Sequence, residues 1–333
     1  MNLIVTGGAG FIGSNLLIYL HRNYPEAELL NIDKLTYASN PEYLSAIQDS
    51  PRYRFQQIDL ADRSAVREVL RDFRPDGIFH LAAESHVDNS ITGPEPFVYS
   101  NYVGTFNLLE EFRQLWDQDG RPHPEKRMLH VSTDEVYGSL DEEGLFSEDT
   151  PYAPNSPYSA TKAGSDFLVR AYYQTYGMNL VTTNCSNNYG PHQHDEKLIP
   201  TVIRNALHHN PIPIYGAGEN VRDWLFVRDH CRALDLAFHR GEAGRTYTIG
   251  GHNEWKNLDL VREICNLLDE EAGSRPEGGF RSLITFVEDR PGHDARYAID
   301  PTRIERELGW QNTQDFRRDL RETVRWYIDR YRS

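Results

Sequence analysis

Tyr158 and Lys162 are four residues apart, inside a helical pattern that covers residues 157–176. Residues at this spacing lie on one face of a helix, so we expect the phenol and the ammonium group to be neighbours. A tyrosine with its ordinary pKa of about 10 is a poor base at neutral pH. The adjacent lysine, together with the positive nicotinamide of a bound dinucleotide, favours the phenolate and is expected to lower the tyrosine pKa. By itself such a pair is typical of an exposed helix face, so a catalytic role requires a second group nearby.

Thr133 supplies that second group, because it ends a predicted strand 25 residues before Tyr158. Its hydroxyl is suited to hold a substrate hydroxyl that the tyrosine deprotonates. Asp134 and Glu135 follow directly, and an isolated pair of this kind is usually a hydrated turn. Beside a strand-end threonine and a Tyr-x-x-x-Lys pair, however, the two carboxylates predict an acid and a base. The residues themselves leave open which carboxylate takes which role.

A glycine-rich segment, residues 7–13, follows a predicted strand at residues 3–6 and opens a predicted helix at residues 11–21. Its Gly-x-x-Gly-x-x-Gly spacing predicts a tight turn at which a pyrophosphate can approach the backbone. The N-terminus of the helix adds amide donors and a partial positive charge. The alternative is a glycine turn in an α/β protein that binds no dinucleotide.

Two carboxylates extend the dinucleotide pattern. Asp33 lies 20 residues after Gly13, at the end of the next predicted strand, where it can accept hydrogen bonds from both ribose hydroxyls of an adenosine. A carboxylate there disfavours a 2′-phosphate, so we expect NAD rather than NADP. Asp59 ends the third predicted strand, and two interpretations stay open for it: a contact with the adenine edge, or a cap at the strand end.

These residues need a scaffold that brings several strand ends together. The predicted strands cover residues 3–6, 29–33, 53–59, 77–82 and 127–132. The predicted helices beyond the glycine segment cover residues 96–116, 157–176, 198–208, 228–240, 258–269 and 315–331. This alternation predicts an α/β fold with a Rossmann-type doubly wound parallel sheet. We expect residues 1–180 to form that domain, with part of its sheet completed by later segments. Residues 181–333 are expected to form mainly a smaller, interleaved, mixed α/β lobe.

Charge and composition exclude several classes of protein. The chain has 333 residues, with 35 basic and 50 acidic side chains and a net charge of −15. Such an acidic chain is a poor binder of nucleic acid or of an anionic membrane. No apolar run approaches the roughly 18–20 residues that span a bilayer, and the N-terminus carries no signal-sequence pattern. With three scattered cysteines and no ligand spacing among the histidines, we expect a cytoplasmic protein without a bound metal.

The glycine segment together with Tyr158 and Lys162 resembles the extended short-chain dehydrogenase/reductase family, which includes nucleotide-sugar epimerases and dehydratases. The resemblance covers essentially the whole chain. A 4-epimerase oxidises and re-reduces a single carbon, so it needs no acid pair beside the threonine. Thr133-Asp134-Glu135 is therefore similar to the 4,6-dehydratases of this family. This resemblance implies NAD+ as a tightly bound, recycled cofactor and dTDP-glucose as the substrate.

The resemblance also implies a reaction. Tyr158 takes the proton of the C4 hydroxyl while hydride leaves C4 for NAD+. The ketone at C4 acidifies the C5 proton, water is eliminated across C5–C6, and the hydride returns to C6. Asp134 is implied as the acid and Glu135 as the base. Because an acid must keep its proton in order to donate it, we expect Asp134 in a poorly solvated place with a raised pKa.

The motifs and the resemblance together select the remaining residues of the site. The expected cofactor contacts, besides Tyr158 and Lys162, are Gly7, Gly10, Phe11, Ile12, Gly13, Asp33, Lys34, Thr36, Asp59, Leu60, Ala82, Ala83 and Asn187. The expected substrate contacts, besides Thr133, are Ser85, Asn188, Lys197, Leu198, Pro213, Tyr215, Arg222, Asn257, Arg290 and His293. The resemblance implies that Tyr215 packs on the nucleotide base and that Arg222 meets the diphosphate, for which a planar guanidinium is well suited.

The family pairs two subunits through long helices, so the resemblance implies a homodimer. Residues 96–116 and 157–176 are the candidates for its four-helix interface. Two alternatives to the dehydratase hypothesis remain. One is another nucleotide-sugar enzyme of the same fold, either a 4-epimerase or a dehydratase that acts on UDP-, CDP- or GDP-sugars. The other is a non-catalytic NAD-binding scaffold, which usually lacks the tyrosine or the lysine of the pair; both are present here.

Overall fold

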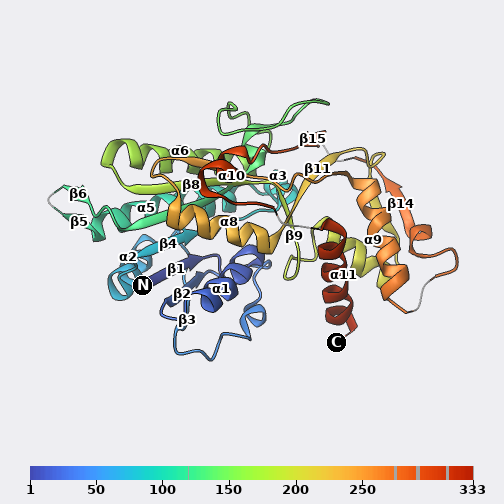
Figure 1. Cartoon of the computed structure of the whole chain (residues 1–333), viewed down its shortest axis with the longest axis horizontal. Helices are drawn as coiled ribbons and strands as arrows, with labels where there is room; N and C mark the ends of the chain where they lie inside the picture. The colour runs from blue at the N-terminus through green and yellow to red at the C-terminus, as the bar shows by residue number, and fades with distance from the viewer. Residues whose placement is uncertain (119, 274–275, 290–292, 313–314, 333) are drawn as a thin grey trace.

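The computed structural model describes residues 1–118, 120–273, 276–289, 293–312 and 315–332. Its centre is a sheet of seven parallel strands in the order β12-β8-β7-β4-β1-β2-β3 (Figure 1). These strands are β1 (Asn2–Thr6), β2 (Glu28–Asp33), β3 (Tyr53–Gln57), β4 (Gly77–His80), β7 (Arg127–Thr133), β8 (Asn179–Cys185) and β12 (Thr246–Ile249). The predicted Rossmann-type sheet is confirmed.

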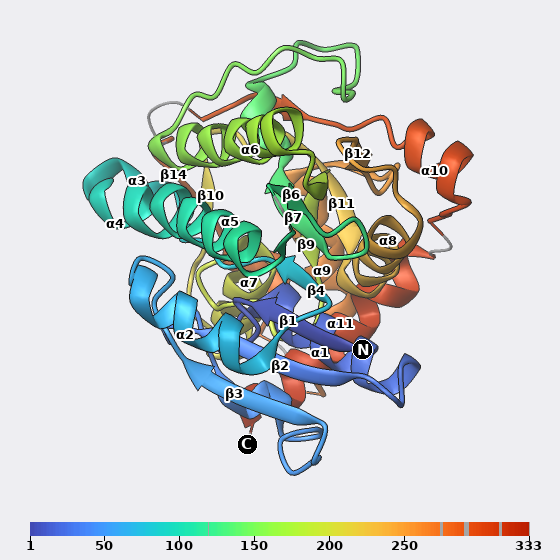
Figure 2. The ribbon, with the colours of Figure 1, turned by 90° about the vertical axis from the view of Figure 1, so that its left-hand side faces the viewer.

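Helices cover both faces of this sheet. Figure 2 shows α2 (Arg63–Phe73), α5 (Gly104–Leu115) and α6 (Pro157–Tyr176) on one side, and α1 (Phe11–Asn23) and α8 (Val227–Arg240) on the other. Alternate residues of a strand point to opposite faces. On β1, Leu3 and Val5 therefore pack in the core under α1 and α8, while Ile4 packs under α2, α5 and α6.

The order of the strands creates a place for a ligand. From β1 the chain continues outward through β2 and β3, then returns to β4 on the other side of β1 and runs on through β7 and β8. The crevice at the carboxyl ends of the strands beside such a reversal is where ligands bind in open α/β sheets. Gly7 follows β1, Leu81 follows β4 and Asp134 follows β7, so the predicted site residues meet at this edge.

Local sequence signals set the helix that carries Tyr158 and Lys162. The Ser156 side chain accepts from the Ser159 amide, the Ser159 side chain accepts from the Ser156 amide, and a proline stands at the first helical position. The helix ends at Gly177, which has the left-handed φ of 73° that favours glycine. The predicted bounds of 157–176 are confirmed.

Three predicted elements differ in detail. The helix expected at residues 96–116 is composed of α4 (Glu95–Phe97), a π-helical turn η2 (Val98–Val103) and α5. The third strand ends at Gln57 instead of residue 59, and the fourth ends at His80 instead of residue 82. After β3 the amide of Ile58 donates to the carbonyl oxygen of Asp33 at 3.1 Å, and after β4 the amides of Leu81 and Ala82 donate to the Thr6 hydroxyl, each at 3.2 Å.

The second half of the chain contributes strands both to the central sheet and to smaller sheets. The strands β8 and β12 lie in the central sheet, whereas the others form small sheets around a separate core that includes Tyr189, Ile199 and Val324. These strands are β9 (Asn187–Tyr189), β10 (Ile212–Tyr215), β11 (Val221–Phe226), β13 (Glu254–Lys256), β14 (Ile284–Val287) and β15 (Arg296–Tyr297). The domain division at residue 180 stays a prediction.

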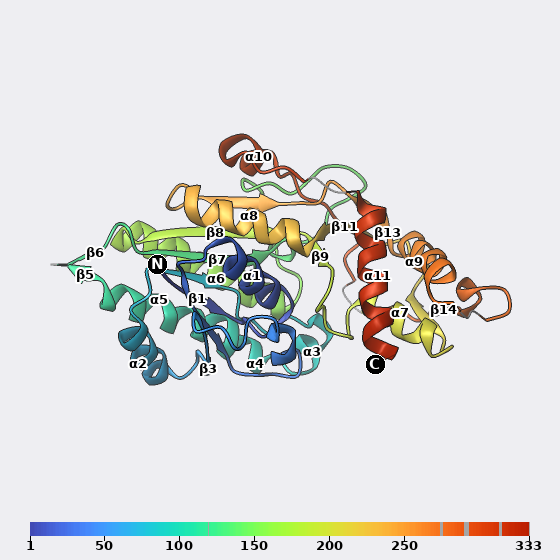
Figure 3. The same cartoon turned by 60° about the horizontal axis from the view of Figure 1, so that its bottom comes forward.

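The helices of this lobe are α7 (Leu198–Leu207), α9 (Asn257–Glu271) and α11 (Phe316–Arg332). Figure 3 shows α11 between the central sheet and the helices α7 and α9. The remaining elements are α3 (Val87–Thr92), α10 (Thr302–Leu308), the hairpin strands β5 (Asp117–Gln118) and β6 (Arg121–Pro122), and the 3₁₀ turns η1 (Pro41–Leu44), η3 (Asp134–Tyr137) and η4 (Phe280–Leu283). In the part of the chain that the structure describes, no helix is both long and apolar enough to cross a membrane.

Candidate active site

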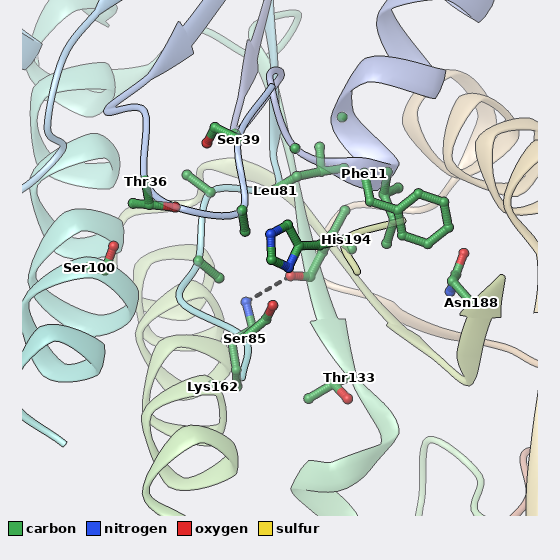
Figure 4. Close-up of a pocket in the computed structure, with 18 of the residues that line it drawn as sticks. Phe11, Thr36, Ser39, Leu81, Ser85, Ser100, Thr133, Lys162, Asn188 and His194 are labelled. Atoms are coloured by element: carbon green, nitrogen blue, oxygen red, sulfur yellow. Dashed lines mark hydrogen bonds between the residues drawn. The ribbon is translucent and has the colours of Figure 1, made fainter. Parts of the chain in front are cut away.

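A cavity of about 290 Å³ opens at the carboxyl edge of the central sheet. Figure 4 shows Thr36 and Ser100 on one side of it, Phe11 and Asn188 on the other, and Lys162 and Thr133 below. The predicted residues that line the cavity are Gly7, Gly10, Phe11, Ile12, Gly13, Asp33, Lys34, Thr36, Leu60, Ala82, Ala83, Ser85, Thr133, Asp134, Glu135, Tyr158, Lys162, Asn187, Asn188 and Lys197. Residues far apart in the sequence are thus brought together around one space.

The glycine loop has no room for side chains. Gly7 has a φ of 70°, and a Cβ atom there would stand 2.8 Å from the backbone of Ala82. A Cβ atom on Gly13 would stand 2.2 Å from the carbonyl oxygen of Gly7. Gly10 precedes α1 and caps it with no side-chain hydrogen bond. The first amides of α1 thus face the cavity without a side-chain cap, which suits a phosphate group.

Asp33 ties the glycine loop to the end of β2. One carboxylate oxygen accepts from the amide of Ala9 at 3.0 Å, and the other accepts from the amide of Leu35 at 2.8 Å and the hydroxyl of Ser39 at 2.9 Å. A carboxylate has about four acceptor positions, so one remains for a ribose hydroxyl. The cradle and this acceptor together fit the adenosine and pyrophosphate of a dinucleotide.

Tyr158 and Thr133 meet at the floor of the cavity. Burial, followed by the charge of Glu135, raises the pKa of Tyr158 well above its ordinary value, while a hydrogen bond with Thr133 acts in the opposite direction. Desolvation is thus the largest effect on this phenol in the protein alone. The predicted lowering, which includes the charge of a bound nicotinamide, stays a prediction. The ammonium of Lys162 donates to the carbonyl oxygen of Val131 at 2.8 Å.

The two carboxylates occupy a short 3₁₀ turn directly after β7. The Thr133 hydroxyl accepts from the amide of Glu135 at 3.3 Å and donates to Asp134 at 3.3 Å. Asp134 is 3% exposed. Its burial, with the charges of Glu135 and Asp223, raises its pKa well above the ordinary value. The expectation of a poorly solvated Asp134 with a raised pKa is confirmed, and among the described residues its Oδ2 atom has no hydrogen-bond partner.

Arg222 lies near the acid rather than in the cavity wall. It is 6% exposed, stacks over Tyr297 at 4.3 Å and donates to the carbonyl oxygens of Val221 at 2.7 Å and Asp294 at 2.9 Å. Its positive charge also lowers the pKa of Asp134, against the larger effects of burial and of two carboxylates. The predicted diphosphate contact of Arg222 stays a prediction.

The other predicted residues are spread over the second lobe and the strand ends. Asp59 accepts from the amide of Ala61 at 2.9 Å, which is the capping arrangement, and its adenine contact stays a prediction. The His293 ring lies 6.2 Å from the Tyr215 ring. The described lining of the cavity does not include Asp59, Tyr215 and His293, nor Leu198, Pro213 and Asn257. Arg290 lies outside the described residues.

The structure adds residues that sequence reasoning did not assign. His194 and Gln193 line the cavity beside Lys197, whose ammonium donates to the carbonyl oxygen of Ser85 at 3.1 Å. Asp223 is 1% exposed and accepts from the amides of Gly251 and Asn253. Its charge contributes to the raised pKa of Asp134. In the sequence, His194 is one of the histidines without ligand spacing, so no role was predicted for it. No local signal marked Asp223.

Comparison with known proteins agrees with this geometry. Residues 4–323 match the family described as GDP-mannose 4,6 dehydratase. A dTDP-glucose 4,6-dehydratase of Neisseria meningitidis serogroup B is 53% identical over 331 residues, which cover 98% of this chain and 93% of the relative. A dTDP-glucose 4,6-dehydratase from Streptomyces venezuelae, solved with NAD and dTDP bound, has a TM-score of 0.90 and 44% identity and covers 99% and 97% of the two chains.

A second solved structure, a dTDP-glucose 4,6-dehydratase from Bacillus anthracis in complex with NAD, has a TM-score of 0.88 and 42% identity, with 99% and 97% of the chains covered. These similarities extend over both lobes and over the turn that carries Asp134 and Glu135. At this level of identity, the chain belongs to the dTDP-glucose 4,6-dehydratase family, a group of nucleotide-sugar dehydratases among the extended short-chain dehydrogenase/reductases.

Proposed function

We propose that this protein converts dTDP-glucose to dTDP-4-keto-6-deoxyglucose and water, as an NAD-dependent hydro-lyase. The observation that carries the proposal is the buried Asp134, whose pKa is raised well above its ordinary value by burial first and then by nearby carboxylates, beside Tyr158 in the same cavity. A protonated carboxyl group at this position has a use in eliminating water, whereas a 4-epimerase has no such step. The identity with dTDP-glucose 4,6-dehydratases supports the same reaction.

NAD would be held by the glycine loop, the N-terminus of α1 and Asp33, with Ala82 and Ala83 leaving space for close approach. Bound there, it would supply the hydride chemistry between C4 and C6 of the sugar and would be recycled within each turnover. The carboxylate of Asp33 supports NAD over NADP, since a 2′-phosphate would meet its negative charge.

Tyr158 takes the proton of the C4 hydroxyl, and the Thr133 hydroxyl orients that group. Because burial raises the pKa of Tyr158, the phenol must be helped to lose its proton, and the Lys162 ammonium beside it stabilises the phenolate. Asp134 then donates its proton to the C6 hydroxyl as it leaves as water, and Glu135 takes the proton from C5. When the hydride has returned to C6, a proton returns to C5. Asn188 and Lys197 bind the substrate from the opposite wall of the cavity.

One incubation tests this function. Purified protein is incubated with dTDP-glucose, and the 4-keto-6-deoxy product is read by its absorbance in alkali. UDP-glucose is tested in parallel as the alternative nucleotide. We expect product from dTDP-glucose without added NAD if the cofactor is retained, or after NAD is supplied. Formation of a C4 epimer without loss of water would favour the 4-epimerase hypothesis instead, and the absence of product from either sugar would contradict an enzymatic role.

A homodimer is the proposed assembly, built on the helices at residues 96–116 and 157–176. Large apolar side chains on them are exposed: Val98 at 44%, Tyr99 at 53%, Tyr102 at 40% and Phe167 at 57%. Such a group on paired helices is typical of an interface between subunits.

A cytoplasmic location is proposed as well. It is supported by the three cysteines, which are all buried and form no disulfide.

A further inference from the structure

Asp166 lies on α6, one helical turn after Lys162, and is 5% exposed. Its carboxylate accepts from the Ser132 hydroxyl at 2.8 Å, the Tyr152 hydroxyl at 2.8 Å and the Asn184 amide at 3.3 Å. The Nε2 atom of His130 lies 3.0 Å from its other oxygen. A buried carboxylate is costly unless it is satisfied by hydrogen bonds, and this one has four polar partners.

These partners come from three different parts of the chain. His130 and Ser132 lie on β7, Asn184 lies on β8, and Tyr152 lies in the segment that precedes α6. The Asn184 amide that contacts Asp166 also donates to the carbonyl oxygen of Thr133 at 3.0 Å. One carboxylate therefore joins α6, which carries Tyr158 and Lys162, to the end of β7, where the acid–base turn begins.

Asp166 does not line the catalytic cavity. It lines a second cavity of about 250 Å³, together with Tyr152, Glu148 and Thr182. Any effect on the reaction must therefore pass through the residues that it holds. Burial first, and then the charge of Asp166, raises the pKa of Tyr152 above its usual range, so this phenol keeps its proton and remains a donor.

We propose that Asp166 is a positioning residue for the dehydratase reaction: it sets the acid–base turn against the helix that carries Tyr158 and Lys162, and it places a negative charge one helical turn from Lys162. The inference rests on the proposed function. It concerns how the turn with Asp134 and Glu135 is placed relative to the helix that carries Tyr158 and Lys162. These two parts of the site are more than twenty residues apart in the sequence.

The charges around Lys162 support the second part of the proposal. Burial lowers the pKa of Lys162, and the nearby charges that raise it again are those of Asp166 and then Cys185. His80 on β4 and His130 on β7 also face this region. Burial, with the Lys162 charge contributing, lowers the pKa of both histidines, so they remain neutral. Asp166 is therefore the principal negative charge that opposes loss of the lysine proton.

The test is Asp166→Asn, which keeps the shape of the side chain but removes the charge and part of the accepting capacity. We expect kcat to fall by roughly 10- to 100-fold, as for a misplacement of about 1 Å, while KM for dTDP-glucose stays within about twofold of the wild type. Without the carboxylate the Lys162 pKa falls. The alkaline loss of kcat/KM should therefore begin at lower pH than in the wild type, which a purely structural role would not produce.

Asp235→Asn is a matched control. Asp235 is also buried, at 9% exposure, and accepts from the hydroxyls of Tyr19 at 3.1 Å and Tyr24 at 2.7 Å, but it lies on α8 away from the cavity. This variant is expected to lose stability without a change in kcat or in the pH profile. If Asp166→Asn alters activity no more than Asp235→Asn does, the positioning role is contradicted.

Tyr152→Phe serves if Asp166→Asn does not fold. It removes one hydrogen bond and leaves the charge, so kcat should fall severalfold with no shift of the alkaline limb. An unchanged kcat in Tyr152→Phe would contradict the positioning role. The wild-type protein is assayed first, because a wild type that forms no product contradicts the proposed function itself. An active wild type with an unaltered Asp166→Asn contradicts only this inference.

Discussion

The Nζ atom of Lys162 donates a hydrogen bond to the carbonyl oxygen of Val131 at 2.8 Å, in a region closed to solvent. The ammonium is thereby anchored to the end of β7 rather than left on an exposed helix face. It lines the catalytic cavity one turn from Tyr158, whose pKa burial raises well above its ordinary value. The ammonium is held where its charge can favour the Tyr158 phenolate, and it must offset the free-energy cost of burying that phenolate.

Removal of this charge should strongly impair the reaction. In Lys162→Met the Tyr158 phenolate loses its adjacent cation, and we expect kcat with dTDP-glucose to fall by about 100-fold or more. Lys126→Met is the matched control, because Lys126 pairs with Asp76 at the opposite edge of the sheet at 2.6 Å. Steady-state kinetics of both variants give the comparison, and equal kcat values in the two would show that Lys162 has no catalytic part.

Asp134→Asn should lose the elimination step. Burial raises the pKa of Asp134, so the protonated acid persists to a pH above its ordinary range and is lost as the pH rises through the raised value. We expect a fall in product formation of about 100-fold or more at neutral pH. The pH profile of the rate should also lose the decrease at high pH that deprotonation of Asp134 causes. Glu142→Gln, an exposed carboxylate, is the control. Product formation by Asp134→Asn at the wild-type rate would end the assignment of the acid.

Gly13→Ala should weaken dinucleotide binding. Its Cβ atom would stand 2.2 Å from the carbonyl oxygen of Gly7, so the loop must shift away from the pyrophosphate position. We expect the Kd for NAD to rise by at least about tenfold, measured by calorimetry on protein freed of cofactor. At Gly93 the nearest atom to an added Cβ is 3.8 Å away, so Gly93→Ala should bind NAD like the wild type. Equal affinity in both variants would exclude the loop as the binding site.

Protonation of His230 in the unfolded chain should make the protein less stable in mild acid. Burial lowers its pKa to about 3, while the unfolded chain takes up the proton near the ordinary value of 6.5. The unfolded state therefore binds more protons between these values, and stability is lost as the pH falls from 6.5 toward 3. At pH 5 the loss from this group is about 2 kcal/mol.

Urea unfolding at pH 7 and pH 5 measures this contribution. In His230→Gln the loss between the two conditions should be smaller by that amount, whereas His208→Gln, at an exposed histidine, should leave it unchanged. The same pH dependence in His230→Gln and the wild type would refute the assignment. Since the His230 ring lies 2.8 Å from the side-chain oxygen of Asn188, the variant also reports on a predicted substrate contact.

The proposed dimer gives a direct test of the exposed helices. A glutamate in place of Tyr99 would place like charges across the symmetric interface, which costs several kcal/mol. We therefore expect Tyr99→Glu to be monomeric in light scattering at concentrations where the wild type is dimeric. Phe286→Glu changes a comparably exposed aromatic residue on β14 and should remain dimeric. A monomeric wild-type protein would contradict the assembly.

Local patterns in the sequence were sufficient for much of this protein. The cap at Ser156, the i, i+4 spacing of Tyr158 and Lys162 and the stop at Gly177 depend on neighbours within a few residues, so α6 was predicted with the bounds that it has. The glycine loop likewise requires its residue types wherever it occurs. Resemblance to a known family then identified the reaction, because Thr133 and the two carboxylates after it form a motif that an epimerase does not need.

Only the tertiary structure decided the properties that depend on packing between distant segments. Desolvation raises the Tyr158 pKa, and no local pattern measures burial. The network around Asp166 joins residues from three segments, and Arg222 turns to backbone carbonyls near Asp294. Spacing along a helix determines which side chains are neighbours on that helix. The energies of their charges are determined by what the rest of the chain places around them.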